Sequence, residues 1–195
     1  MSAPPAVAPR ETLPPRTPAV AAPRGAVAVA AAGCGLLAGR PLLVEVARPA
    51  PVLIALFGGL LMVSLAWPGR RASVRQPVGA LALGIAAFAV GRLLSAGAAV
   101  PAATAFAVGI NTLAAVAEEA FFRRLVYGAL LAGGPGVAVV GSALLFAAVH
   151  VSVYGLWVLP IDLAAGLLLS WQRQATGSWT VPALTHAVAN LLVVL

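Results

Sequence analysis

Two adjacent glutamates and two adjacent arginines stand inside an otherwise apolar stretch, AVAEEAFFRRLVYG, at residues 115–128. An ionisable side chain at bilayer depth costs about 2.5 to 3.5 kcal/mol, so such groups usually face a polar interior and mark a functional site. If the stretch is helical, Glu119 and Arg123 are four residues apart with the acid N-terminal, the favourable orientation for an ion pair. Glu118 lies about 100° away around the helix. The spacing therefore predicts a Glu119–Arg123 pair and leaves Glu118 as a free carboxylate.

The composition indicates that this stretch belongs to a membrane protein. Of the 195 residues, 62% are hydrophobic and 9% are charged, whereas soluble domains have about 25% charged residues. The mean hydropathy is +1.02. We therefore predict an all-α, polytopic transmembrane helical bundle whose first partner is the lipid bilayer.

The net charge of +7 arises from arginines, which supply all 12 basic residues. Most of them lie outside the apolar segments, as topology signals and headgroup contacts do. A nucleic-acid-binding protein would instead need a basic face on a soluble fold. The pattern therefore excludes nucleic acid as a partner.

The chain divides into a proline-rich tail and a series of apolar runs. Residues 1–24 contain many prolines together with arginines and predict a disordered basic tail. Arg40 and Pro41 are interpreted as the end of the first run. The apolar runs predict about seven membrane helices, at about residues 25–39, 51–67, 77–91, 101–131, 136–153, 156–172 and 181–195.

The distribution of arginines predicts the orientation. With the N-terminus in the cytoplasm, seven arginines of the N-terminal tail and the loops lie inside, against three outside, namely Arg40, Arg48 and Arg92. Cytoplasmic loops carry the excess of basic residues, so this orientation is favoured. The alanine- and arginine-rich, lysine-free composition is typical of a GC-rich bacterium, so we expect an integral protein of the bacterial plasma membrane.

The only two histidines both lie in apolar runs at helical spacing from another notable side chain. Phe146 precedes His150 by four residues in LLFAAVH, and Asn190 follows His186 by four in LTHAVAN. Each pair therefore shares one helix face. A single buried histidine is more often structural, because it needs only a hydrogen-bond partner. Three helices that each present a polar face in lipid predict a shared, water-accessible pocket.

Taken in order, these residues resemble a known signature. Glu118-Glu119-x-x-x-Arg123, then Phe146-x-x-x-His150, then His186-x-x-x-Asn190 is similar to the three motifs of the CAAX protease and bacteriocin-processing (CPBP, Abi-type) family of intramembrane endopeptidases. The resemblance covers about residues 101–195, which it marks as the catalytic transmembrane domain. Residues 25–100 would then be N-terminal transmembrane helices.

The resemblance implies peptide-bond hydrolysis inside the membrane. Glu118 would be the general base that activates water, with His150 helping to position it. His186 and Asn190 would stabilise the oxyanion. The supporting residues would be Glu119, Arg123 and Phe146. Amide hydrolysis needs such a base, and burial in an apolar pocket makes a glutamate easier to protonate.

Two further polar residues receive structural interpretations. Asn111 lies seven residues before Glu118 and returns to the same face, where a role in helix packing is favoured. Asp162 follows Pro160 and is interpreted as part of the first turn of a helix, where a carboxylate favours the helix dipole.

Three alternatives remain at this stage. A zinc-dependent protease would use Glu118, His150 and His186 as ligands; the metal-free interpretation is favoured because HExxH is absent, so no cofactor is expected. A non-catalytic membrane scaffold is the second alternative. The third is a transporter or channel with a glutamate proton relay, although the first three runs show none of the matching charge that paired repeats would carry. The family name suggests CAAX tails or bacteriocin leaders, and we expect a membrane-associated or hydrophobic peptide substrate.

Overall fold

The computed structural model describes residues 24–67, 75–94 and 104–194, and every regular element within these ranges is a helix. The predicted disordered tail lies, apart from Arg24, outside the described residues. The helices are α1 (Arg24–Ala38), α2 (Arg40–Val46), α3 (Pro49–Ala66), α4 (Pro77–Leu94), α5 (Ala105–Glu119), η1 (Ala120–Val126), α6 (Tyr127–Leu130), η2 (Leu131–Gly133), α7 (Pro135–Tyr154), η3 (Leu156–Val158), α8 (Leu159–Thr176) and α9 (Thr180–Val194).

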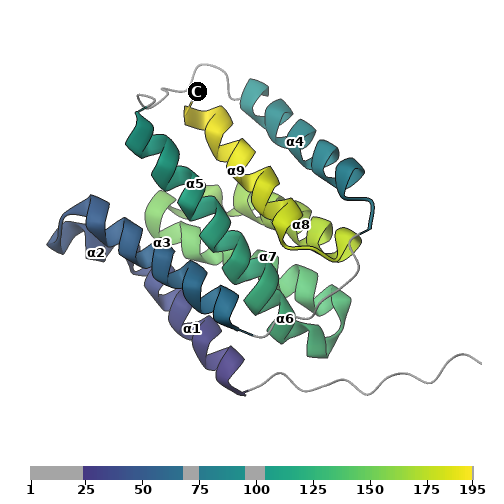
Figure 1. Cartoon of the computed structure of the whole chain (residues 1–195), viewed down its shortest axis with the longest axis horizontal. Coiled ribbons are helices and arrows are strands. Elements are labelled where there is room, and N and C mark those ends of the chain that lie inside the picture. Colours follow the sequence, from purple (N-terminus) through teal and green to yellow (C-terminus); the bar gives the residue numbers. More distant parts are fainter. Residues whose placement is uncertain (1–23, 68–74, 95–103, 195) are drawn as a thin grey trace, which may run out of the picture.

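The helices pack as a bundle around α5 (Figure 1). α5 contacts α3 on one side and α9 on the other, and α9 in turn contacts α4. α7 packs along α8, where Gly166 allows a close approach: a Cβ on this glycine would lie 3.1 Å from the backbone of Ala143. Small residues at such crossings let membrane helices approach closely.

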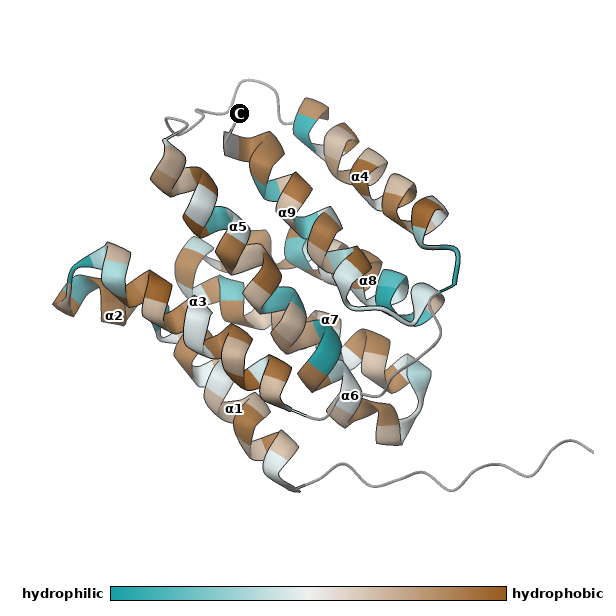
Figure 2. Ribbon diagram, viewed as in Figure 1, coloured by the Kyte–Doolittle hydropathy of each residue, from teal (hydrophilic) through white to brown (hydrophobic). Residues whose placement is uncertain are grey.

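Within the described ranges, four helices are long and apolar enough to cross a membrane: Pro49–Ala66, Pro77–Leu94, Ala105–Gly133 and Pro135–Tyr154. The bent pair Gly25–Ala38 and Arg40–Val46 gives a fifth if it forms one span. Many large apolar side chains of these helices are exposed, and Figure 2 colours much of the ribbon brown for hydrophobic residues. Such a surface suits lipid rather than water, and the chain is an integral membrane protein.

The predicted count of about seven membrane helices is not confirmed. The last two predicted runs do form helices, α8 and α9, but neither is among the described helices that meet the criteria of length and hydropathy for a span. In α8 the reason is polar content, because Asp162, Gln172 and Arg173 interrupt its apolar sequence.

The predicted end of the first run just before Arg40 and Pro41 is confirmed, because α1 ends at Ala38, but the second short helix that begins at Arg40 was not predicted. The chain bends by 55° there and continues as α2. Proline is tolerated in the first turn of a helix, where its missing N–H needs no partner. The bend brings Arg40 toward α5, where its side chain reaches Glu118.

The run predicted at 101–131 forms one continuous helical segment from Ala105 to Gly133, but part of it is not α-helical. Ala120–Val126 is a π-helix, and the N–H of Tyr127 donates to the carbonyl of Phe122, five residues back. π-Helical turns are rare and occur frequently at functional sites. Here the wider turn follows directly after the two glutamates.

The hydrophobic core surrounds this turn. Phe121 and Phe122 are fully buried, with ring centroids 4.9 Å apart, and Phe122 meets Phe146 of α7 edge to face at 5.4 Å. Edge-to-face pairs are the preferred aromatic geometry. The aromatic cluster therefore fixes α7 against the segment that carries the glutamates.

Candidate active site

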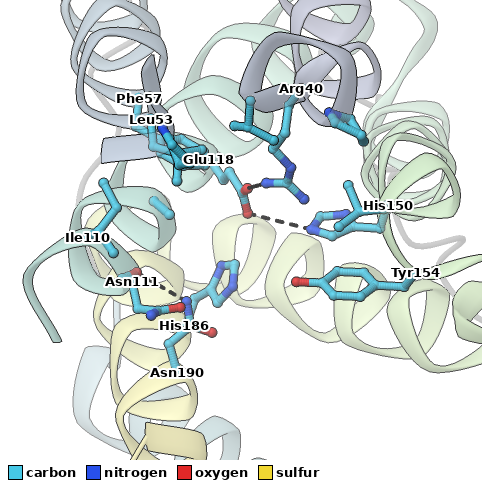
Figure 3. A pocket seen from close by; sticks show the side chains of 15 residues that line it. Arg40, Leu53, Phe57, Ile110, Asn111, Glu118, His150, Tyr154, His186 and Asn190 are labelled. Carbon is cyan, nitrogen blue, oxygen red and sulfur yellow. Dashed lines mark hydrogen bonds and ion pairs between the residues drawn. The ribbon is translucent and has the colours of Figure 1, made fainter. Parts of the chain in front are cut away.

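A cavity of about 460 Å³ opens between α2, α3, α5, α7 and α9. Its wall includes Glu118 from α5, His150 from α7, and His186 and Asn190 from α9. Figure 3 shows these side chains directed toward one another across the cavity. The four residues that the motifs single out as candidate catalytic groups thus lie around one space.

Glu118 is almost buried and its two carboxylate oxygens face different partners. Oε2 lies 3.8 Å from Nε2 of His150, and Oε1 lies 3.4 Å from Nη1 of Arg40. The contact with Arg40 was not foreseen in the prediction of a carboxylate left free for chemistry. The reason is the bend between α1 and α2, which brings an arginine from a distant part of the chain to the cavity wall.

The ring of His150 has a defined orientation. Nδ1 lies 2.8 Å from the backbone carbonyl oxygen of Phe146. Because a carbonyl oxygen only accepts, Nδ1 carries the hydrogen, and in the neutral ring Nε2 is an acceptor facing Glu118. The ring centroids of Phe146 and His150 are 4.6 Å apart, which confirms the predicted shared face. Tyr154, one turn further, stacks on the other side of the imidazole at 6.1 Å.

Asp162 lies in the first turn of α8, as predicted, but it also faces the site. Its Oδ2 is 3.8 Å from Nδ1 of His150 and has no hydrogen-bond partner of its own within the described residues. His150 therefore lies between two carboxylates, Glu118 on one side and Asp162 on the other. Nothing in the sequence indicates this second contact, because the start of a helix explains the aspartate equally well.

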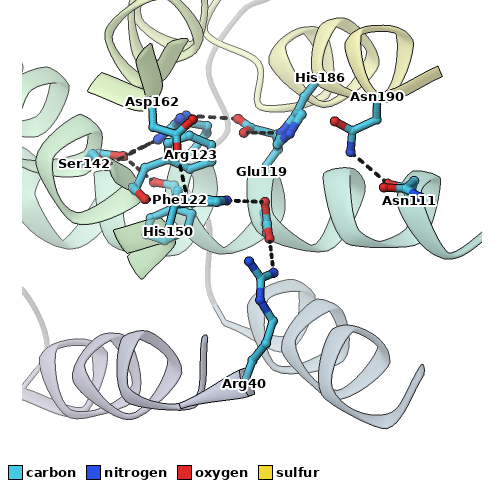
Figure 4. A network of polar contacts seen from close by, with 12 residues as sticks. Arg40, Asn111, Glu119, Phe122, Arg123, Ser142, His150, Asp162, His186 and Asn190 are labelled. Atoms are coloured by element: carbon cyan, nitrogen blue, oxygen red, sulfur yellow. Dashed lines mark hydrogen bonds and ion pairs between the residues drawn. The ribbon is translucent and has the colours of Figure 1, made fainter. Parts of the chain in front are cut away.

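Glu119 and Arg123 form the predicted ion pair. Nε of Arg123 lies 2.9 Å from Oε2 of Glu119, and both side chains are completely buried. Arg123 also donates to the hydroxyl of Ser142 at 2.9 Å, and its guanidinium lies over the ring of Phe146 at 4.9 Å. Figure 4 follows this network of polar contacts.

The other carboxylate oxygen of Glu119 contacts His186. Oε1 accepts from Nδ1 of His186 at 3.0 Å, so the carboxylate joins Arg123 of η1 to α9. This contact orients the imidazole and directs its other nitrogen away from Glu119. Sequence reasoning assigned Glu119 to Arg123 alone and missed the histidine.

Asn190 and Asn111 meet across the contact between α5 and α9. The side-chain amide of Asn190 donates to the backbone carbonyl of Asn111 at 3.1 Å. The side chain of Asn111 in turn donates to the carbonyl of Ala107 at 2.8 Å. Asn190 has a second amide hydrogen, which no partner among the described residues takes.

A zinc ion would need Glu118, His150 and His186 to converge. No group of three or more histidine, cysteine, aspartate or glutamate side chains within the described ranges could hold a metal ion. Nδ1 of His186 is also already engaged with Glu119. The residues as arranged do not fit a zinc site, so no step below is derived through a metal.

These features define a class of protein. Buried carboxylates and histidines around a cavity in a membrane bundle are typical of an intramembrane enzyme. Residues 100–192 match the family model described as type II CAAX prenyl endopeptidase Rce1-like. This part of the chain is Rce1-like, which confirms the resemblance to the CPBP family and supports a membrane protease at the general level. No curated protein and no solved structure matches the chain.

Proposed function

We propose that this chain is an intramembrane endopeptidase that hydrolyses a peptide bond of a membrane-associated or hydrophobic peptide, in CAAX-type or bacteriocin-type processing. The observation that carries the proposal is the cavity that Glu118, His150, His186 and Asn190 line together. The match of residues 100–192 supports the type of reaction. The excess of arginines on one side of the predicted runs supports a cytoplasmic N-terminus in a bacterial plasma membrane.

The proposed reaction begins with water between Glu118 and His150. Oε2 of Glu118 and Nε2 of His150, 3.8 Å apart, can both accept a hydrogen bond from a water molecule at the edge of the cavity. Glu118 takes one proton from this water as the oxygen attacks the carbonyl carbon of the substrate. The same proton then passes to the leaving amine as the C–N bond breaks, so the carboxylate is regenerated.

The oxyanion that forms needs hydrogen-bond donors on the other side of the cavity. Asn190 offers its second amide hydrogen. His186 can donate through Nε2 when its ring carries both protons, a state that the carboxylate of Glu119 at 3.0 Å favours. Loss of one such donor typically lowers kcat by about 10²- to 10³-fold. In this proposal Glu119 acts through His186, and Arg123 acts through Glu119, so neither residue contacts the substrate.

The test replaces the proposed base and keeps its shape. Glu118→Gln should reduce cleavage of a hydrophobic peptide in proteoliposomes to background, because the amide cannot take a proton. The protein should still insert and fold. Glu45→Gln is the matched control, since Glu45 is an exposed glutamate of α2 outside the cavity, and this variant should cleave normally.

Two results would oppose the proposal. Wild-type activity in Glu118→Gln would remove Glu118 from the chemistry. Peptide binding without cleavage by the unaltered protein would instead support the non-catalytic scaffold.

A further inference from the structure

Arg40 enters the cavity from a helix that precedes the matched segment of residues 100–192. It begins α2, directly after the 55° bend, and its side chain is 13% exposed. Nη1 lies 3.4 Å from Oε1 of Glu118, and the guanidinium lies over the ring of Phe57 at 5.9 Å. Figure 3 shows Arg40 reaching Glu118 from the side opposite Asn190.

The contact divides the carboxylate of Glu118 between two neighbours. Oε1 faces Arg40, and Oε2 faces His150. A buried carboxylate without a partner is costly, and Arg40 is the single arginine among the described residues that line the cavity. The guanidinium thus stabilises Glu118 in one orientation while its second oxygen stays directed at the site of the water.

The distance also matters for the chemistry. The Arg40–Glu118 contact is 3.4 Å, compared with 2.9 Å for Arg123 and Glu119. Charge-assisted hydrogen bonds of full strength measure about 2.7 to 2.9 Å. The Arg40–Glu118 contact is therefore the looser of the two ion pairs, and it leaves Oε2 of Glu118 directed at His150.

We propose that Arg40 is a positioning residue for the catalytic base, and that α2 therefore completes an active site whose other proposed residues all lie within residues 100–192. This inference rests on the proposed function. Arg40 holds Oε1 of Glu118, and Phe57 holds the guanidinium. The substrate contacts neither of these groups in the catalytic step.

Arg40 could have two other roles, and each would give a different result when the arginine is removed. An arginine that blocks the base would act as a latch, and its removal would raise kcat. An arginine that binds a carboxylate at the end of the substrate would discriminate between a peptide with a free C-terminal carboxylate and the same peptide as an amide. Its removal would raise KM for the first peptide only.

The experiment compares Arg40→Ala and Arg40→Lys in the full chain, each with the two forms of the peptide. We expect Arg40→Ala to lower kcat by about 10²-fold, the usual effect of a misplaced catalytic group. KM should stay within about twofold for both peptides, since positioning acts on the chemical step. Arg40→Lys, which keeps the charge but not the fork of donors, should fall between wild type and alanine.

Chemical rescue separates positioning from a general structural role. Guanidinium ion at low millimolar concentration should restore part of the kcat of Arg40→Ala, because the vacated space adjoins Glu118. Urea, which has nearly the same shape but no charge, should not. Arg124→Ala is the matched control: Arg124 donates to the backbone carbonyls of Ser64, Leu65 and Trp67 at the end of α3, away from the cavity. Its variant should lose thermal stability, keep kcat within about twofold and show no rescue.

Each remaining result overturns the proposal. A raised kcat in Arg40→Ala supports the latch, a KM increase confined to the free carboxylate supports substrate binding, and a loss that guanidinium does not restore supports a structural role. If Arg40→Ala does not fold, Arg40→Lys decides: a lower kcat at unchanged KM supports positioning, and an unchanged or higher kcat contradicts it. Cleavage by the unaltered protein and its loss in Glu118→Gln test the proposed function separately.

Discussion

At the scale of single residues, the two neighbouring glutamates have different tasks, and this difference can be measured. Glu119→Gln removes the charge that compensates Arg123, whose side chain is fully buried. Breaking a buried pair from one side costs about 3 to 5 kcal/mol, because the remaining charge is left uncompensated. We expect this variant to unfold at a clearly lower temperature in detergent and to give a lower yield of folded protein.

Glu118→Gln is the comparison for that measurement. Its partner Arg40 is less deeply buried and makes a longer contact, so the loss of stability should be much smaller. Equal losses in both variants would contradict the division into a structural and a chemical glutamate.

The contacts that the sequence predicted correctly are all local. The Glu119–Arg123 pair and the shared face of Phe146 and His150 follow from spacings of four residues in a helix. Arg40 and Glu118 are instead separated by 78 residues, and no periodicity relates them. Contacts of this kind depend on how helices pack, which the sequence of either helix alone does not contain.

At the scale of the elements, apolar runs bounded by proline, glycine and arginine predicted most helices well. The helix α2 that begins at Arg40 was not predicted, because proline suits both the end of one helix and the first turn of the next. The π-helix at Ala120–Val126 was also missed. Its residues suit an α-helix, and tertiary bonds favour the wider turn: Ser142 donates to the carbonyl of Phe122 and Arg173 to that of Arg123, both at 3.0 Å.

The crossing of α7 and α8 gives a prediction at the same scale. α7 carries His150 and α8 carries Asp162, and Gly166 allows their close approach against the backbone of Ala143. Gly166→Val should force the helices apart, at a cost of about 1 to 3 kcal/mol for overpacking. We expect a lower unfolding temperature and reduced cleavage.

Gly109→Val supplies the control, because a Cβ added at this exposed position of α5 meets nothing within 4 Å beyond the adjacent residues and backbone of its own helix. This variant should differ little from wild type in a thermal unfolding assay. If both valines had the same effect, the cause would be helix propensity and not the crossing.

At the scale of the whole molecule, the sequence predicted a membrane bundle but not how its polar residues are distributed. Seven apolar runs suggested about seven spans, whereas four to five helices of the described structure qualify. The polar side chains of α8 are used inside the bundle. Gln172, for example, donates to the carbonyl of Ala80 at 2.7 Å and to the hydroxyl of Thr185 at 2.9 Å, and so joins α8 to α4 and α9. Hydropathy alone cannot separate such a helix from a lipid-facing one.

The whole molecule also determines the expected response to metal removal. A catalytic zinc needs three converging protein ligands and an open position, yet Glu118 is shared between Arg40 and His150, and Nδ1 of His186 is held by Glu119. We therefore expect purified, active protein to contain less than stoichiometric zinc by elemental analysis and to retain its cleavage rate after prolonged dialysis against a chelator. The same dialysis applied to a known zinc protease in the same detergent controls for incomplete stripping. Stoichiometric zinc, with activity lost on dialysis and restored by added zinc, would require Glu118 and both histidines to rearrange into a metal site and would replace the glutamate mechanism.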